Sequence, residues 1–533
     1  MAKSNLRIDM LGTSFSISTD EDAAYLESLL NRYRIKVQNT QKKTGVGDPL
    51  QLSIVTGIIL CDEIEQIQKR RGGPVSSPDD LDEAERLTLD LITRINQVLE
   101  NGAVKGKTGR IFKLENPVKH YPWGSPRLLS EFLGKPNESG ESWAELWMGA
   151  RGESPSVVID SEAGGLRRSL GELIKKDPRR YLGEKVNAEF GELPFLFKLL
   201  AADKPLSIQV HPGLEQAKAG WERENAAGIP LDGPARNYKD PNHKPEILSA
   251  LTPFRALCGF RNIPETIKLL DLFGGKGWKD RGDKPAVHLS AALKSEFARL
   301  RACLEAGNGL SDFFSALLEM DNEARRDLGV YTLAQCPQLE QDYPEYFEEW
   351  LTAASFARLY PEDPAIIAPL YLNLLKLEKG EAIYLPPGTL HAYIEGFGVE
   401  LMANSDNVLR GGLTAKHMDK EELKRILSFT PYHPGILRPA GVPPGEGWLF
   451  YPTGVREFTL GTASSQGEGI PLPEGKPAIV LVTEGEAVIS AGGEAEITLR
   501  RGESAFAAPA EREELMLRGN FRVYAAFPGS VQP

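Results

Sequence analysis

The sequence predicts an α+β chain of several domains, in which a small head of a β-hairpin and helices precedes a larger β-rich part with a helical insertion. Three observations predict this class. Residues 5–18 alternate apolar and polar side chains before helical spacing begins, residues 263–365 carry Leu and Phe at helical spacing, and residues 475–527 alternate repeatedly. At about 150 residues per domain, a chain of 533 residues corresponds to about three or four units.

The composition excludes several classes of protein. With 41% hydrophobic residues the chain can build cores, so extensive disorder is excluded. The net charge of −12 argues against nucleic-acid binding through a basic surface. The N-terminus lacks a signal-peptide core, and the longest apolar stretch, residues 54–61, is too short to cross a bilayer. The four scattered cysteines form no CxxC pair, which fits a reducing compartment. We therefore expect a cytoplasmic protein with no nucleic-acid or membrane partner.

The predicted head comprises residues 1–100. Leu6, Ile8 and Met10 share one face of a strand, and the alternation continues after a Leu-Gly turn, which predicts a β-hairpin over residues 5–18. The acidic segment at residues 19–22 then favours the start of a helix.

Two further helices are predicted in the head. One begins after Asp48 and Pro49, and the other spans residues 79–100 with one apolar stripe, which fits either a coiled coil or packing on its own domain. Residues 101–110 are rich in Gly and Lys and predict an interdomain linker. Residues 1–110 hold 15 Lys and Arg against 16 Asp and Glu, so the acidity lies almost entirely in the rest of the chain.

The rest of the chain divides into three parts. Residues 111–262 are rich in short strands and turns, residues 263–365 form the helical insertion, and residues 366–533 return to strands. We expect the last part to complete the first β domain and to add a C-terminal β domain.

The segment LSIQVHP at residues 206–212 is the first candidate for chemistry. Strand periodicity places Gln209 and His211 on one face, two residues apart, where both are possible metal ligands. On spacing alone, two solvent-facing side chains are an equally good interpretation.

The segment YKDPNHKPE at residues 238–246 is polar and rich in turn-forming residues. Glu246 is a possible metal ligand, and Lys244 is a possible contact for a phosphate or an oxyanion. A solvated surface loop is the alternative interpretation.

The segment GEAIYLPPGTLHAY at residues 380–393 predicts two strands around a tight Pro-Gly turn that delivers His391 onto the second strand. This spacing resembles the second motif of cupins, small β-barrels that bind metal in the barrel mouth, with Glu395 in place of the usual Asn. A buried structural histidine is the alternative. Together, Gln209, His211, Glu246 and His391 form a nitrogen and oxygen set that suits zinc or another borderline divalent ion.

Two cations follow in ELMANSDNVLRGGLTAK at residues 400–416. Arg410 stands in a Gly-rich segment that we expect to be a turn, and Lys416 follows six residues later. Two cations beside a divalent metal suit a phosphorylated, anionic substrate. Either residue taken alone is an ordinary surface charge.

Residues 111–533 resemble the type I mannose-6-phosphate isomerases (phosphomannose isomerases). The resemblance rests on YPWG (residues 121–124), LSIQVHP, DPNHKPE, LPPGTLHAY and NSDNVLRGGLTAKH, which occur in the family's order. It implies a cupin-type β-jelly-roll fold with a helical domain, and one zinc ion held by Gln209, His211, Glu246 and His391. Arg410 falls on the family's active-site arginine. The resemblance also places seven residues in the pocket: Trp123, Lys198, Ser207, Lys244, Tyr393, Glu400 and Lys416.

The activity that this resemblance implies is aldose–ketose isomerisation of mannose 6-phosphate and fructose 6-phosphate through an enediolate, which feeds mannose and GDP-mannose metabolism. Arg410 would stabilise the enediolate, and Lys416 with Ser207 would hold the phosphate. For the proton carrier, Glu400, Lys244 and a metal-bound water remain open.

Residues 1–100 resemble the ZapA family of small cell-division proteins that associate with FtsZ, through IDMLGTSFSIST and DPLQLSIVTGIILCDEI. This resemblance implies self-association and FtsZ as a partner. The break RRGGPVSSP at residues 70–78 departs from the family's long coiled-coil helix. Two other functions remain as alternatives to the isomerase. One is a cell-division scaffold with a passive isomerase part, and the other is a cupin acting on another sugar phosphate.

Overall fold

The computed structural model describes residues 4–10, 13–19, 23–44, 56, 60, 110–152, 154–160, 166–275, 289–441, 447–491, 496–509 and 515–529. The chain forms two compact units, Met1–Gly106 and Lys107–Pro533, each of which is described by itself. Among the described residues, none of the helices combines the length and the apolar character needed to cross a membrane.

The first unit contains the predicted hairpin. Strand β1 (Ser4–Met10) pairs antiparallel with β2 (Thr13–Thr19), so that Leu6 lies opposite Ile17 and Ile8 opposite Phe15. Helix α1 (Ala23–Thr44) follows. The two further helices predicted for the head, and the linker up to residue 109, lie outside the described residues apart from residues 56 and 60.

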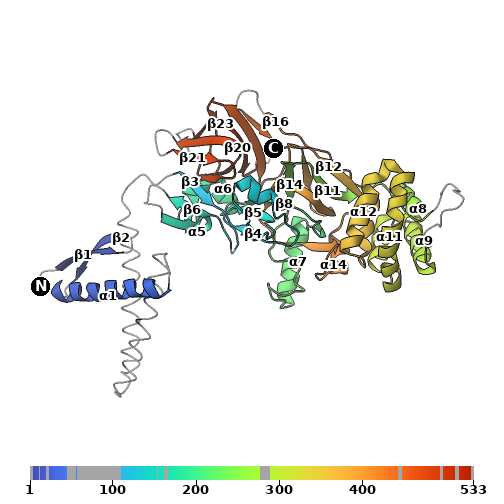
Figure 1. Cartoon of the computed structure of the whole chain (residues 1–533), viewed down its shortest axis with the longest axis horizontal. Coiled ribbons are helices and arrows are strands. Elements are labelled where there is room, and N and C mark those ends of the chain that lie inside the picture. Colours follow the sequence, from blue (N-terminus) through green and yellow to red (C-terminus); the bar gives the residue numbers. More distant parts are fainter. Residues whose placement is uncertain are drawn as a thin grey trace, which may run out of the picture. The chain divides into compact units, whose positions relative to one another are not determined.

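The described residues of the second unit form two antiparallel sheets (Figure 1). Among its described residues, the first sheet has ten strands, and the motifs lie on or beside them. These strands are β4 (Val118–Lys119), β5 (Glu145–Met148), β8 (Phe195–Ala202), β9 (Ile208–Val210), β10 (Glu246–Ala250), β11 (Phe254–Phe260), β12 (Leu372–Leu377), β13 (Ala382–Leu385), β14 (His391–Ala403) and β15 (Leu409–Gly412).

The described part of the second sheet is built mainly from the C-terminal region. Its strands are β3 (Ile111–Glu115), β6 (Val157–Asp160), β7 (Leu166–Ser169), β16 (Ala440–Gly441), β17 (Trp448–Phe450), β18 (Thr459–Gln466), β19 (Ile470–Pro471), β20 (Ala478–Ala491), β21 (Ile497–Arg500), β22 (Ser504–Ala507) and β23 (Leu515–Phe527). Strand β3 pairs antiparallel with β22, with Phe112 opposite Phe506. Residues 111–262 therefore contribute to both sheets, a long-range pairing that hydrophobic periodicity alone does not reveal.

Helices form one end of the second unit, between β11 and β12 (Figure 1). They are α8 (Ile263–Phe273), α9 (Ala291–Glu305), α10 (Leu310–Leu318), α11 (Asn322–Asp342), α12 (Phe347–Leu359) and α13 (Ala368–Tyr371), with 3-10 turns at Pro344–Tyr346 and Pro364–Ile367. Side chains of Asn262, Ser290 and Asp321 cap three of these helices. Elsewhere in the described part of the unit lie five more helices: α4 (Leu128–Leu133), α5 (Leu170–Lys176), α6 (Pro178–Phe190), α7 (Leu214–Ala226) and α14 (Lys420–Ile426).

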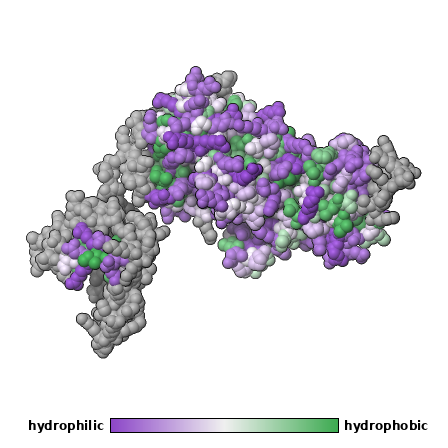
Figure 2. All heavy atoms as spheres, viewed as in Figure 1, coloured by the Kyte–Doolittle hydropathy of each residue, from purple (hydrophilic) through white to green (hydrophobic). Residues whose placement is uncertain are grey.

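Two apolar clusters hold these layers together. One contains Phe197 and Leu401 from the first sheet with Ile479 and Tyr524 from the second, so the two sheets pack against each other. The other joins the helices to the first sheet. The face of this unit seen in Figure 2 is mostly hydrophilic, with small scattered apolar spots. Cys258, Cys303 and Cys336 are free thiols.

Candidate metal centre and active site

The first sheet brings the four proposed metal ligands together from three motifs. In the pairing of β14 with β9, His391 lies directly opposite Gln209. His211 follows β9 immediately, and Glu246 begins β10, which also pairs with β14. The tight turn at Gly388 donates its backbone N–H to the carbonyl of His211 at 2.8 Å. The sheet and this turn therefore fix the relative positions of these residues.

Three ligand atoms converge without hydrogen-bond partners. The Nε2 atoms of His211 and His391 each lie 3.4 Å from Oε2 of Glu246. All three atoms are buried and make no hydrogen bond. A tetrahedral zinc site with bonds of about 2.0–2.1 Å separates its ligand atoms by about 3.4 Å. The observed spacing, and the otherwise costly burial of unpaired polar atoms, therefore fit a bound divalent ion.

Hydrogen bonds orient both imidazole rings. Nδ1 of His211 donates to the carbonyl of Asn407 at 2.7 Å, and Nδ1 of His391 donates to the carbonyl of Thr389 at 2.9 Å. Each ring then presents a lone pair on Nε2, as metal-binding histidines commonly do. Burial first, and the charge of Lys244 second, lower the pKa of His211 to about 4, so its ring is neutral at neutral pH.

Lys244 lies beside the carboxylate of the centre. Its Nζ is 2.9 Å from Oε1 of Glu246, and both side chains are buried. Burial alone raises the pKa of Glu246, but the charge of Lys244 and the contact with His211 outweigh it and lower the pKa well below its usual value. Glu246 is therefore ionised, as a metal ligand must be.

A second buried cluster lies next to the centre. Oε2 of Glu400 accepts a hydrogen bond from Nζ of Lys198 at 2.8 Å, and its Oε1 accepts one from the hydroxyl of Tyr393 at 2.8 Å. Burial is the largest effect on the pKa of Glu400, and the pKa is raised despite the opposing charge of Lys198. Burial lowers the pKa of Lys198, but Glu145 and Glu400 overcome this effect and raise it.

Glu145 was missed by the sequence analysis. Its Oε1 lies 3.5 Å from Nζ of Lys198, and its Oε2 accepts a hydrogen bond from the indole of Trp147 at 2.7 Å. No motif marks Glu145, because it stands on strand β5, more than 50 residues before Lys198 in the sequence. Only the pairing of β5 with β8 brings the two strands together.

Strand β14 bends between Tyr393 and Glu400. Strict alternation places these two residues on opposite faces of the sheet, because they are seven positions apart. Gly396 between them has φ +132°, and a Cβ atom there would lie 2.5 Å from Cδ2 of Phe254. Between Tyr393 and Glu395 the pairing of β14 with β11 shifts by one residue, a β-bulge that interrupts the alternation and lets the two side chains meet in a hydrogen bond.

Arg410 and Lys416 lie in the same neighbourhood. Arg410 is half-buried on strand β15, opposite Gln209, and not in a turn as predicted. Lys416 is exposed, and the charge of Arg410 is the largest effect lowering its pKa, followed by burial and by the charge of Lys239. Lys239 is thus a third cation near this pair, which the sequence analysis missed because it lies in another motif.

The backbone between Arg410 and Lys416 is strained. Leu413 has φ +53°, which is rare for a residue other than glycine. The preceding Gly412 leaves no room for a side chain, since a Cβ atom would lie 2.3 Å from that of Ala365. The carboxylate of Asp363 accepts the backbone N–H of Thr414 at 3.4 Å, so the helical part contacts the loop that carries the cations.

Trp123 and Ser207 occupy the segments around the start of β9. The carbonyl of Trp123 accepts backbone N–H groups from Asp203 and Lys204, and its ring stacks on Tyr121 with centroids 5.5 Å apart. Ser207 is half-buried just before β9.

Comparison with known proteins identifies the family. Residues 111–263 match the model of the phosphomannose isomerase type I catalytic domain. Mannose-6-phosphate isomerase from Escherichia coli is 39% identical over 413 residues, which are 77% of this chain and 98% of that protein. The chain belongs to the type I phosphomannose isomerase family. The human mannose-6-phosphate isomerase is 34% identical over 335 residues, covering 60% of this chain and 74% of that protein.

Solved phosphomannose isomerases share the fold of the second unit. A variant from Salmonella typhimurium aligns with a TM-score of 0.70 and 36% identity, over 79% of this chain and all of that one. A zinc-bound mannose 6-phosphate isomerase aligns with a TM-score of 0.69, 36% identity and the same coverage. In addition to the isomerase part, residues 6–100 match the family model of the cell division protein ZapA.

Proposed function

We propose that the second unit interconverts mannose 6-phosphate and fructose 6-phosphate through an enediolate, with one zinc ion per chain. The unpaired, converging atoms of His211, Glu246 and His391 are the observation that carries this proposal. The family's known members with this activity, and the cations beside the centre, support it. We further propose that the inserted helices, residues 263–365, form a helical domain separate from the two β-sheets of this unit.

Gln209, His211, Glu246 and His391 are the residues that would hold the zinc ion. Zinc bound there supplies a positive charge that polarises a substrate oxygen. An enediolate carries negative charge on the oxygens of carbons 1 and 2. The guanidinium of Arg410, on the neighbouring strand, also stabilises this negative charge. Lys244 keeps Glu246 ionised through their contact.

The phosphate of the substrate requires cations at a distance from the reacting carbons. We assign this role to Lys416 and Ser207, with Lys239 as a further contact. Trp123 and Tyr393 then border the sugar, one beside the start of β9 and one on β14.

A proton must move between carbons 1 and 2. Glu400 is the stronger candidate for carrying it, because Lys198 and Tyr393 hold both of its oxygens and burial raises its pKa. Lys244 remains the second candidate, since its contact with Glu246 places its ammonium group at the centre. A Glu400→Gln variant that keeps its turnover would exclude Glu400 and leave Lys244 and a metal-bound water as the carriers.

A coupled assay with the full chain tests the proposed reaction. We expect conversion of mannose 6-phosphate to fructose 6-phosphate and loss of this activity with a chelator. Rapid conversion of a different aldose phosphate, with none of mannose 6-phosphate, would favour the cupin acting on another substrate. No conversion of any sugar phosphate by the zinc-loaded chain would favour the cell-division scaffold with a passive isomerase part.

Replacing Lys239 by alanine is expected to raise KM for mannose 6-phosphate about 2- to 5-fold, the scale of losing an exposed ion pair. Turnover at saturating substrate and zinc content should not change. Steady-state kinetics measure both constants, with Lys379→Ala as the matched control because Lys379 pairs with Glu484, on the second sheet. An unchanged KM in Lys239→Ala would remove this residue from the phosphate site.

For the first unit we propose self-association and binding to FtsZ in the cytoplasm, on the basis of the match of residues 6–100 to ZapA. The full chain should sediment with FtsZ polymers, whereas residues 107–533 alone should remain in the supernatant. The shorter chain is a suitable control, because relatives such as the Escherichia coli enzyme are covered almost entirely by the second unit. Equal sedimentation of both chains would contradict the proposal.

A further inference from the structure

We propose that Asn407 and Asp240 form a polar clamp that positions the metal ligands and sets how tightly the centre holds zinc. The inference rests on the zinc centre proposed above and concerns two residues that do not contact the metal themselves. Both residues are buried, and neither was singled out from the sequence.

The first half of the clamp is the link from Asn407 to His211. The backbone carbonyl of Asn407 accepts the hydrogen bond from Nδ1 of His211 at 2.7 Å. This contact selects the tautomer whose Nε2 can bind a metal, and it sets the plane of the ring. The position of the Asn407 backbone therefore decides where that lone pair points.

The side chain of Asn407 ties this backbone to the segment at residues 239–242. Its Oδ1 accepts the backbone N–H of Lys239 at 2.7 Å, and that of Asp240 at 3.3 Å. Its Nδ2 donates to the carbonyls of Asp240 at 2.8 Å and Asn242 at 2.9 Å. Both polar atoms of the buried Asn407 amide therefore form hydrogen bonds to the segment at residues 239–242, as expected of a well-ordered buried polar group.

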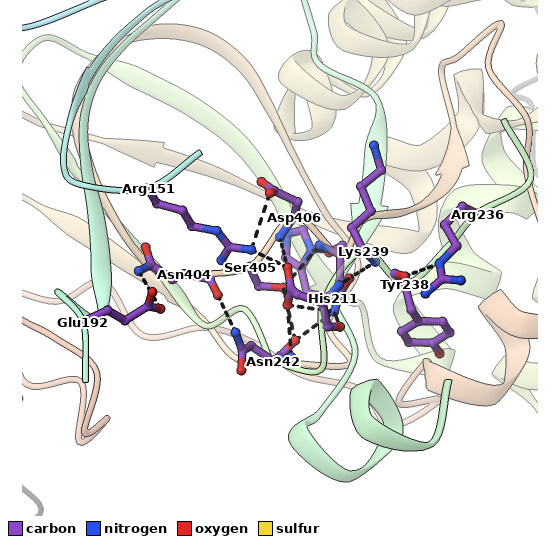
Figure 3. A network of polar contacts seen from close by, with 12 residues as sticks. Arg151, Glu192, His211, Arg236, Tyr238, Lys239, Asn242, Asn404, Ser405 and Asp406 are labelled. Atoms are coloured by element: carbon purple, nitrogen blue, oxygen red, sulfur yellow. Dashed lines mark hydrogen bonds and ion pairs between the residues drawn. The ribbon is translucent and has the colours of Figure 1, made fainter. Parts of the chain in front are cut away.

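Asp240 closes the clamp from the other side. Its Oδ2 accepts from the guanidinium of Arg151 at 2.7 Å and from the backbone N–H of Asp406 at 2.8 Å. Its Oδ1 accepts from the hydroxyl of Ser405 at 2.9 Å. Figure 3 shows this network between Arg151 and His211, with the side chain of Lys239 pointing away from it.

The clamp joins segments that carry different ligands. The segment at residues 239–242 leads directly to Lys244 and Glu246, while Asn407 holds His211. A change in the clamp therefore alters two ligands at once, without removing either. Losing an outer partner of a metal ligand typically lowers metal affinity about 10- to 100-fold.

The test measures zinc affinity in full-length Asn407→Ala and Asp240→Asn variants by competition with a chromogenic chelator. We expect the zinc dissociation constant to rise about 10- to 100-fold in both variants. With zinc saturating, turnover should recover most of the wild-type value and KM should change little. A general loss of stability would not produce this recovery.

Asn116→Ala serves as the matched control, because Asn116 also links segments through side-chain hydrogen bonds, to Ser504 and Ser156. Its zinc affinity should equal that of the wild type. Arg151→Ala, which removes a partner of Asp240 and Asp406 at the edge of the clamp, covers the case in which Asn407→Ala does not fold, and it should weaken zinc binding to a smaller extent.

Zinc affinity unchanged in the folded clamp variants, or weakened equally in Asn116→Ala, would overturn the inference. Because this measurement needs no substrate, it is separate from the proposed reaction. A wild-type chain that binds zinc but does not convert mannose 6-phosphate would contradict the reaction, while the weaker binding of the clamp variants would still support the clamp.

Discussion

His391→Ala is expected to lose bound zinc and isomerase activity together. The imidazole supplies one of three buried atoms that converge at 3.4 Å contacts, and alanine offers no ligand in its place. Removing an outer partner of a metal ligand typically lowers metal affinity about 10- to 100-fold. Removing the ligand itself should lower the affinity further. We therefore expect activity at stoichiometric zinc to fall by at least about 100-fold. Metal analysis of the purified variant and a coupled assay measure the two losses.

His433→Ala is the control for this variant, since His433 is exposed and its Nδ1 contacts only the side chain of Asn373 among the contacts described. It should keep both zinc and activity. A full zinc complement in His391→Ala would exclude His391 from the ligand set.

Arg410→Ala is expected to keep its zinc and lose turnover. Arg410 lies opposite Gln209 in the sheet, so its positive charge stands beside the metal centre without being part of it. Removing one preorganised donor to a developing oxyanion typically lowers kcat about 10²- to 10³-fold, or about 3–4 kcal/mol of barrier. Steady-state kinetics with metal analysis of the same preparation test this expectation.

Two companion variants separate the role of charge from that of shape. Arg410→Lys retains the charge but not the planar group, and we expect it to recover only part of the lost turnover. Arg438→Ala removes an exposed arginine that pairs with Glu381, and it should behave as the wild type. A turnover number in Arg410→Ala equal to that of the wild type would remove Arg410 from the chemistry.

Local patterns in the sequence predict much of the metal centre. Alternation places Gln209 and His211 on one face of a short strand, and the Pro-Gly turn predicts that His391 begins the next strand. In the structure these are β9 and β14, which pair directly. Hydrophobic periodicity likewise predicts the hairpin of the first unit and the helices between β11 and β12.

What the sequence does not predict depends on long-range pairing. Glu145 meets Lys198 only because β5 pairs with β8, and β3 joins a sheet whose other strands are mostly hundreds of residues away. Alternation even predicts the wrong geometry for Tyr393 and Glu400, since a β-bulge between Tyr393 and Glu395 interrupts it. The clamp of Asp240 and Asn407 is hidden for the same reason, because its residues lie in two motifs.

Zinc-dependent isomerisation is tested most directly by a zinc titration of the chelated, metal-free full chain while the conversion of mannose 6-phosphate to fructose 6-phosphate is followed. We expect no activity before zinc is added, and a rise that reaches its plateau at one zinc ion per chain. Full activity in the metal-free chain, or a metal-loaded chain without isomerase activity, would contradict this expectation.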